Sequence, residues 1–278
     1  MEWWQALVLG VVQGLTEFFP ISSSGHLELV PWLFNWKELE SESVGTAFDA
    51  ALHLGTLLAV VFAVRRELGT LIVAGLRHPM LSREQRSAHR DGQLAWLYLL
   101  TAVPAAAVGV FFDDVIADKL GGPVVVAASL IGFGAVLWWA DRRSGERVAE
   151  QLTTRDALLI GAAQVLSLNP GTSRSGITIS AMRALGYTRA AAVRMSFVIG
   201  VPIIAGAGLW KVAGLIIDGV PEGLASAMVI GVATAAVTGW LAISALQRLA
   251  ARSNFDVFVI YRVGLGIAVL GIIASGLR

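Results

Sequence analysis

Two short polar segments interrupt apolar stretches of this chain, and both carry side chains that can handle phosphate. The first holds a carboxylate, an amide, three hydroxyls and an imidazole: Glu17, Gln13, Ser22, Ser23, Ser24 and His26. Gln13 and Glu17 are four residues apart and share one helix face, and Pro20 ends that helix before the hydroxyls. The segment therefore offers hydroxyl nucleophile candidates beside a carboxylate and an imidazole.

Each of these residues also has a structural interpretation. Glu17 could reach the membrane surface with its charged end, the serines could cap the next helix, and His26 could be a buried, hydrogen-bonded histidine. The position of His26 three residues after Ser23 favours the chemical interpretation.

The second polar segment, residues 169–176, reads NPGTSRSG and precedes the apolar run 177–185. A glycine-containing turn that leads into a helix N-terminus presents free amides and the positive end of the helix dipole, which favours a phosphate. Arg174 can bind two phosphate oxygens at once. The alternative is that Arg174 pairs with Glu17 for structure alone. If the two segments meet, the parts of a phosphoryl-transfer or phosphate-hydrolysis site converge.

The elements that must position these residues are membrane helices. The 278 residues are 56% hydrophobic and only 15% charged, with a mean hydropathy of +0.70. The apolar blocks are continuous and do not alternate with period two, which indicates helices and excludes a barrel. A net charge of +1 and the lack of a basic run give no sign of nucleic-acid binding, and with no cysteine there is no disulfide or thiolate chemistry. The N-terminal residues lack the positive region of a signal peptide, so we treat them as mature structure.

The long apolar blocks predict six transmembrane helices, at residues 47–64, 94–112, 124–140, 195–212, 224–246 and 257–274. Alternate connections are rich in arginine: Arg65, Arg66, Arg77, Arg83, Arg86 and Arg90, then Arg142, Arg143, Arg147 and Arg155, then Arg248 and Arg252. The opposite connections are acidic, with Glu38, Glu40, Glu42, Asp113, Asp114, Asp118, Asp218 and Glu222 beside Lys37 and Lys119. The positive-inside rule therefore puts the arginine-rich connections in the cytoplasm.

Segments 3–34 and 157–185 are apolar but broken in the middle, so we expect two re-entrant helical hairpins. They resemble each other at an offset of 151 residues, which aligns GVVQGLT from residue 10 with GAAQVLS from residue 161. Each half, about 1–140 and about 156–278, then holds one hairpin and three spans, which predicts an inverted repeat within a single membrane domain, 1–278. Such repeats point to a site near the bilayer midplane.

QGLTEFFPISSSGHL (13–27) and NPGTSRSGITISAMRALG (169–186) resemble the two signature regions of the bacterial undecaprenyl-diphosphate phosphatases, also described as bacitracin-resistance proteins. FDAALHLG (48–55) is similar to a third family segment. The resemblance implies a hydrolase of the bacterial cytoplasmic (inner) membrane that converts undecaprenyl diphosphate to the monophosphate. It recycles the lipid carrier of peptidoglycan synthesis at a site that opens to the outer, periplasmic face.

The resemblance also implies roles for individual residues. Ser23 matches the nucleophile proposed in the family, His26 the general acid/base, and Glu17 with Gln13 the metal site for a divalent cation, Mg2+ or Ca2+. Gln13 departs from the carboxylate variant of that motif. The implied phosphate-binding residues are Ser22, Ser24, Gly171, Thr172, Ser173, Arg174 and Ser175.

Several alternatives stay open at this point. Attack by Ser23 and attack by an activated water are both compatible with these residues. A polyprenyl-phosphate flippase or transporter is the rival function, because inverted repeats with broken helices are transporter architecture. A second phosphatase class, with K-x6-RP, PSGH and SR-x5-H signatures, is disfavoured because the chain has no Arg-Pro pair and has Ser180 in place of its second histidine. The expected partners are an isoprenoid diphosphate and membrane lipids; a homodimer is left open.

Three further polar residues lie in predicted spans. We expect Asp49 to cap its helix or to line the cavity mouth, and His53 to be buried. A charged arginine inside a span costs free energy, so Arg262 should pair with a carboxylate or a carbonyl.

Overall fold

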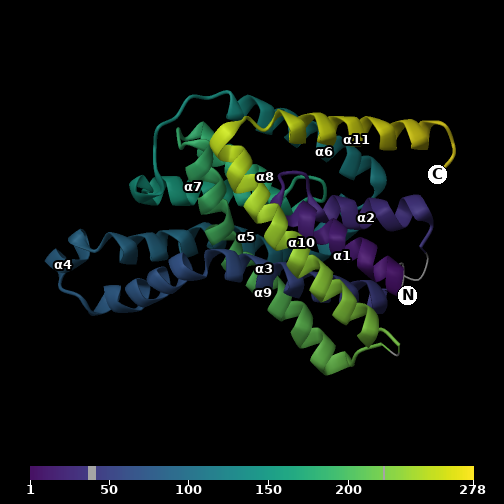
Figure 1. The fold of residues 1–278 in the computed structure, drawn as a ribbon, viewed down its shortest axis with the longest axis horizontal. Helices are drawn as coiled ribbons and strands as arrows, with labels where there is room; N and C mark the ends of the chain where they lie inside the picture. The colour runs from purple at the N-terminus through teal and green to yellow at the C-terminus, as the bar shows by residue number, and fades with distance from the viewer. Residues whose placement is uncertain (37–41, 222) are drawn as a thin grey trace.

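The computed structural model describes residues 1–36, 42–221 and 223–278, and its regular elements there are all helical (Figure 1). The α-helices are α1 (Trp3–Phe18), α2 (Ser23–Phe34), α3 (Glu42–Arg77), α4 (Arg83–Ala88), α5 (Arg90–Leu120), α6 (Pro123–Asp141), α7 (Thr154–Val165), α8 (Arg174–Ala184), α9 (Arg189–Asp218), α10 (Ala225–Arg252) and α11 (Asp256–Ala274). The short 3-10 helices are η2 (His78–Met80), η3 (Ala149–Gln151) and η4 (Leu166–Leu168). The predicted all-α class is confirmed.

Six stretches of the described chain are long and apolar enough to cross a membrane: Val44–Met80, Arg90–Phe111, Pro123–Asp141, Arg189–Leu215, Ala225–Arg252 and Asp256–Ala274. They coincide with the six predicted spans, which confirms a polytopic membrane protein. Helix α3 is longer than the predicted first span and continues through Arg65 to Arg77. Arginine, glutamate and leucine are good helix formers, so a helix can outlast the apolar stretch that it contains.

Both polar segments break their helices. In the first, α1 ends at Phe18 and α2 begins at Ser23, and we call residues 19–22 the first elbow. In the second, α7 ends at Val165 and α8 begins at Arg174, and residues 166–173 form the second elbow, which includes η4. In Figure 1, α8 lies in the middle of the molecule, and α2 runs from there towards the end that carries the N-terminus.

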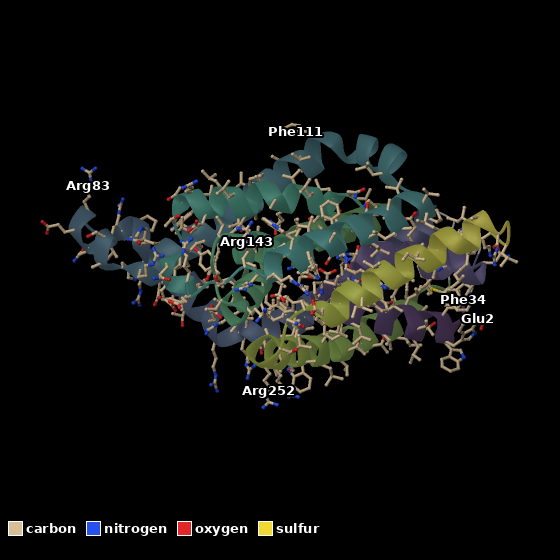
Figure 2. The ribbon with its side chains drawn as sticks, turned by 90° about the horizontal axis from the view of Figure 1, so that it is seen from above. Glu2, Phe34, Arg83, Phe111, Arg143 and Arg252 are labelled. Atoms are coloured by element: carbon tan, nitrogen blue, oxygen red, sulfur yellow. The ribbon has the colours of Figure 1, made fainter. Side chains whose placement is uncertain are left out.

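Each broken segment returns to the end of the molecule from which it starts. The ring of Trp4, at the start of α1, lies 5.3 Å from the ring of Trp36, just after α2. Glu2 and Phe34 lie at the same end of the long axis (Figure 2). In the second segment Arg147 donates to the carboxylate of Asp156 at the start of α7 and to the carbonyl of Leu185 after α8. A re-entrant hairpin must start and end on the same side of the membrane, and both segments start and end at the same end of the molecule. Their insertion into a bilayer stays a prediction.

The Asp156 carboxyl is the centre of the contacts that join α7 to the segment after α8. Burial raises its pKa, but hydrogen bonds from Arg147, Thr153 and Tyr187 outweigh burial and lower the pKa to about 2. This carboxylate is thus charged over the whole physiological pH range.

The first helix of each broken segment packs on a helix of the other half of the chain, and the two contacts correspond to each other. Helix α1 lies along α10, and α7 lies along α5. Glycines at corresponding positions allow both contacts, because a Cβ on Gly10 would lie 1.8 Å from Thr234 Oγ1 and one on Gly161 would lie 2.9 Å from the Thr101 carbonyl oxygen. Small residues let membrane helices approach closely. The matching contacts agree with two repeated halves, while the inverted repeat and the single-domain boundaries stay predictions.

The arginine-rich connection that contains α4 lies at one end of the long axis, where Figure 2 labels Arg83, opposite Glu2 and Phe34. Part of the acidic charge pattern cannot be placed in the same way. Lys37, Glu38, Glu40 and Glu222, and the side chains of Glu42, Asp113, Asp114, Asp118, Lys119 and Asp218, lie outside the described residues. The membrane orientation therefore stays a prediction from charge.

Candidate active site

A serine in an unusual backbone conformation ends each elbow. Ser22 and Ser173 both have φ of +77°, and each is the N-cap of the following helix, α2 or α8. The Ser22 hydroxyl accepts from the Gly25 amide over 3.3 Å, and the Ser173 hydroxyl accepts from the Gly176 amide over 3.1 Å. A positive φ is costly for a residue other than glycine. Because the same strained cap occurs twice, 151 residues apart, the two elbows share one local backbone structure.

The two elbows touch each other. The Gly171 amide donates to the Ser22 hydroxyl over 3.1 Å, and the Ser175 hydroxyl donates to the Phe19 carbonyl over 3.1 Å. A Cβ on Gly25 would lie only 3.2 Å from the Gly171 Cα. The absence of a side chain at Gly25 therefore lets the start of α2 approach the second elbow, and the absence of one at Gly171 lets that elbow approach Val126 and Ser129 of α6. The expected convergence of the two segments is confirmed.

Arg262 of α11 donates hydrogen bonds to both elbows. Its side chain is fully buried, and its guanidinium donates to the Pro20 carbonyl over 2.9 Å, and to those of Gly171 and Thr172 over 2.9 and 3.0 Å. Two further bonds go to carbonyls of α6. Arg262 thus pairs with carbonyls, one of the two expected outcomes, and it satisfies elbow carbonyls that no helix satisfies.

A chain of polar side chains joins the end of α1 and the start of α2 to the start of α8. Arg174 Nη2 donates to Glu17 Oε1 over 2.9 Å, and the Ser23 hydroxyl donates to Glu17 Oε2 over 2.6 Å. Gln13 Nε2 also approaches Glu17 Oε2, at 3.4 Å. The Glu17 side chain is 8% exposed and that of Arg174 is 11% exposed, so the pair is shielded from water. The pairing of Arg174 with Glu17, which the sequence left as an alternative, is present, and the Glu17 carboxylate also accepts from the hydroxyl of Ser23.

Helix α9 fixes the other side of the Arg174 guanidinium. Arg174 Nη1 donates to the Ser196 carbonyl over 3.0 Å, and the group lies over Gly200, where a Cβ would be 2.3 Å from Nη1. Arg174 Nε is buried without a partner among the described residues. Gly200 is a site residue that sequence reasoning missed; the signal was a glycine in an aliphatic span.

This arrangement has the parts of nucleophilic or general-base catalysis. The Ser23 hydroxyl donates to a carboxylate that can accept its proton, and Arg174 orients that carboxylate, which is the nucleophile, base and orienting group of such sites. The first amides of α2 have no acceptor within the helix, so an anion that reaches Ser23 also meets a helix N-terminus.

His26 is buried, and its two ring nitrogens are directed to groups other than the Ser23 hydroxyl. Its Nδ1 lies 2.6 Å from the Ser22 carbonyl oxygen and its Nε2 lies 2.7 Å from the Tyr261 hydroxyl. A carbonyl can only accept, so Nδ1 carries a proton and the neutral ring accepts from Tyr261 through Nε2. Tyr261 was not predicted. A tyrosine next to Arg262 in an otherwise apolar span was the available signal.

The predicted phosphate-binding residues divide into two groups. Gly171, Thr172, Ser173 and Ser175 are buried and bonded inside the protein. Ser22 is also buried between the elbows, whereas Ser24 is exposed and Ser23 is half-buried. The side chains of Ser23, Ser24 and Arg174 are the ones that a phosphate could reach with this backbone, while the buried residues shape the elbows.

The predicted cation site has few protein ligands. No group of three or more His, Asp or Glu side chains that could hold a metal occurs in the part of the chain that the structure describes. Gln13 Oε1, however, is buried without a partner there, on the helix face that carries Glu17. Mg2+ is usually bound through one or two carboxylates together with substrate phosphates. Glu17 and Gln13 therefore fit a cation whose remaining ligands come from the substrate.

A cavity of about 620 Å³ lies along α2, the helix that follows the first elbow. Ser24 and Glu28 of α2 line it together with residues of α1, α3 and α9, among them Asp49. Asp49 therefore lines the cavity, one of its two expected positions. The cavity gives an amphiphile of substantial size access to Ser24.

The chain resembles known proteins over nearly its whole length. Over residues 6–268 the chain matches the family described as "Bacitracin resistance protein BacA". It is 44% identical to a protein named undecaprenyl-diphosphatase from Thermomicrobium roseum, with 99% of both chains covered, and equally similar to one of that name from Gemmatimonas aurantiaca. A third, from Elusimicrobium minutum, is 42% identical over 95% of this chain and 96% of the relative. The similarity spans both elbows.

Proposed function

Because the chain belongs to the bacitracin resistance protein BacA family, we propose that it hydrolyses undecaprenyl diphosphate to undecaprenyl phosphate and inorganic phosphate. The shared name of its relatives, undecaprenyl-diphosphatase, is that of a hydrolase, and this favours hydrolysis over the rival polyprenyl-phosphate transporter. The proposed location is the bacterial cytoplasmic membrane, with the site open to the outer face, where the reaction returns the lipid carrier to peptidoglycan synthesis.

One observation carries the proposal: Arg174, Glu17 and Ser23 form a continuous, shielded chain of hydrogen bonds. Hydrolysis of a diphosphate depends mainly on positioning and on neutralising charge. Arg174 supplies a fixed positive charge, the α2 N-terminus supplies free amides, and Ser23 has its proton directed at a carboxylate. A transporter needs a binding site for phosphate, but it has no need for a hydroxyl that is hydrogen-bonded to a base.

In the proposed reaction the terminal phosphate lies against Ser23 and Arg174. Either the Ser23 oxygen or a water attacks the terminal phosphorus, and Glu17 accepts the proton of the attacking group. The bond from that phosphorus to the bridging oxygen breaks, and the lipid monophosphate leaves with the bonding electrons. If Ser23 attacks, a water then hydrolyses the phosphoserine in a second step. Both routes stay open.

His26 has a different proposed role from direct acid/base chemistry. Its two nitrogens face the Ser22 carbonyl and the Tyr261 hydroxyl, so it would have to break one of these bonds to exchange a proton with substrate. We assign it the positioning of the Ser22 backbone, next to the nucleophile.

A divalent cation, Mg2+ or Ca2+, is part of the proposal. Glu17 and Gln13 would contribute its protein ligands, and when bound it would neutralise charge on the phosphates. Phosphate release should then stop on chelation and return on addition of the cation.

The test is phosphate release from farnesyl or undecaprenyl diphosphate by the purified protein, with and without chelator. We expect Ser23→Ala and Arg174→Ala to lower the rate by at least about 10²-fold, the usual effect of losing one such group. Arg142→Ala, which removes an exposed arginine paired with Asp256, is the control and should keep the wild-type rate. Wild-type release no faster than that of the two site variants would favour the transporter.

A further inference from the structure

A second polar cluster lines the cavity along α2, and the reaction above does not use it. His53 Nδ1 lies 3.2 Å from Asp49 Oδ1, one turn earlier on α3. Lys211 of α9 forms an ion pair with the other oxygen of the same carboxylate. Asp49, His53 and Lys211 all line the cavity of about 620 Å³. We call these three residues the α3–α9 cluster.

The position of Lys211 inside an apolar span makes its positive charge costly in free energy. It lies within the apolar span Arg189–Leu215, and the other two lysines of the chain, Lys37 and Lys119, lie in predicted connections. Charged residues inside a membrane span are rare and generally mark a substrate path or a functional pair. The pair with Asp49 joins the two halves of the chain at the wall of a cavity, where a ligand can reach it.

The geometry of the cluster leaves donors available to a ligand. An ammonium group has three N–H donors, and Asp49 accounts for one of those of Lys211. His53 directs Nδ1 to the backbone and side chain of Asp49, and its Nε2 has no hydrogen-bond partner among the described residues. Asp49 therefore orients two side chains whose remaining polar atoms can contact an anion.

The rest of the cavity wall indicates the kind of anion. Leu9, Leu27, Trp32, Phe48 and Leu52 give it an apolar lining, while the α3–α9 cluster, Ser24 and Glu28 are polar. The Glu28 carboxylate accepts from the Gly122 amide. A lipid with an anionic headgroup matches both properties, whereas free phosphate has no use for the apolar wall. Ser24 in the cavity wall directly follows Ser23 on α2, so the wall comes within one residue of the reacting hydroxyl along the helix.

We propose that Lys211 and His53, held by Asp49, bind the lipid-linked phosphate of the substrate, the one that leaves, while the terminal phosphate lies at Ser23 and Arg174. This inference rests on the proposed function and extends it to the second phosphate. When the bond between the terminal phosphorus and the bridging oxygen breaks, the electron pair stays on the lipid monophosphate. The ammonium of Lys211 offsets that added negative charge, and no proton has to move.

The experiment compares Lys211→Met with Arg194→Met. Arg194 is a matched control because it lies on the same helix and also pairs with a carboxylate of α3, Glu67, 17 positions and thus roughly 25 Å along α9. For each purified variant, kcat/KM for the lipid diphosphate is measured together with inhibition by inorganic phosphate and by a polyprenyl monophosphate. Lys211→Arg tests whether a cation alone restores activity.

We expect Lys211→Met to lower kcat/KM by about 10²-fold and to weaken inhibition by the polyprenyl monophosphate at least about tenfold. Inhibition by inorganic phosphate should stay within about twofold, since that ion binds at Ser23 and Arg174. Lys211→Arg should recover most of kcat/KM, and Arg194→Met should match the wild type. Equal weakening of both inhibitors, or a loss no larger than that of Arg194→Met, would overturn the assignment.

A failure of the proposed function would look different. If the wild type released no phosphate, binding of a polyprenyl monophosphate to the protein in nanodiscs would still test the cluster. Binding that is at least about tenfold weaker in Lys211→Met than in Arg194→Met would support the lipid-phosphate site without hydrolysis. Equal binding by the two variants would refute it.

Discussion

Replacing Arg262 by methionine tests whether the two elbows depend on one buried side chain. Methionine replaces the aliphatic part of the arginine side chain but removes the guanidinium and its five hydrogen bonds to carbonyls. The two acceptors in α6 also have helical partners, so the main loss is at the elbow carbonyls of Pro20, Gly171 and Thr172. Their bonds are 2.9 to 3.0 Å long.

The expected loss of stability follows from those three carbonyls. A buried acceptor left without its partner costs about 1–3 kcal/mol, and removing the buried guanidinium returns part of that cost by ending its desolvation. At the low end of the range we expect Arg262→Met to lower the free energy of unfolding by about 3 kcal/mol. For a chain of this size that corresponds to a fall in Tm of roughly 6–12 °C.

Activity should fall by more than stability alone explains. At temperatures where both proteins are folded, loss of elbow alignment should reduce phosphate release by about 10²-fold, since a displacement of about 1 Å can have that effect. Thermal melting in detergent and phosphate release are measured together. The control is Arg142→Met, which breaks an exposed pair with Asp256 worth about 0–1 kcal/mol. An Arg262→Met protein with a Tm within about 2 °C and turnover within about threefold of wild type would refute the reasoning.

Three further predictions follow from the described contacts. Tyr261→Phe removes the 2.7 Å bond to His26, worth about 1 kcal/mol, so kcat/KM should fall about fivefold if the imidazole only positions the backbone; a loss beyond about 10²-fold in steady-state kinetics would show that it takes part in the chemistry. The pKa of Asp156 is lowered to about 2, so the charged carboxylate contributes about 2 kcal/mol to the free energy of unfolding. This contribution is present above pH 4 and is lost as the pH falls towards 2. The difference in Tm between wild type and Asp156→Asn should therefore shrink over that interval, and a constant difference would contradict the lowered pKa. For orientation, a cysteine at Ser41, a position outside the described residues, should react with an impermeant thiol reagent added outside intact cells, and one at Ser144 should not; the reverse pattern would invert the topology.

Much of the architecture could be predicted from the sequence because it depends on short-range properties. Continuous apolar blocks identify the six spans, and Pro20 and Pro170 mark the regions where helices break. The similarity at an offset of 151 residues predicted matching segments, and Ser22 and Ser173 have the same φ and the same capping bond. Hydropathy, helix breaking and capping are determined by residues within a turn or two of one another, so a linear pattern is enough to read them.

The long-range partners depended on the tertiary structure. Glu17 and Arg174 are 157 positions apart, and several other cations could have neutralised Glu17 equally well on paper. The sequence likewise left Arg262 with either a carboxylate or a carbonyl as partner, and it gave no indication that His26 would bind Tyr261. Burial makes each polar group find some partner, but only the packing of the helices decides which one is within reach. The sequence therefore determined the spans, the breaks and the chemical inventory of the site, and the packing of α1, α2, α8 and α11 determined the pairings.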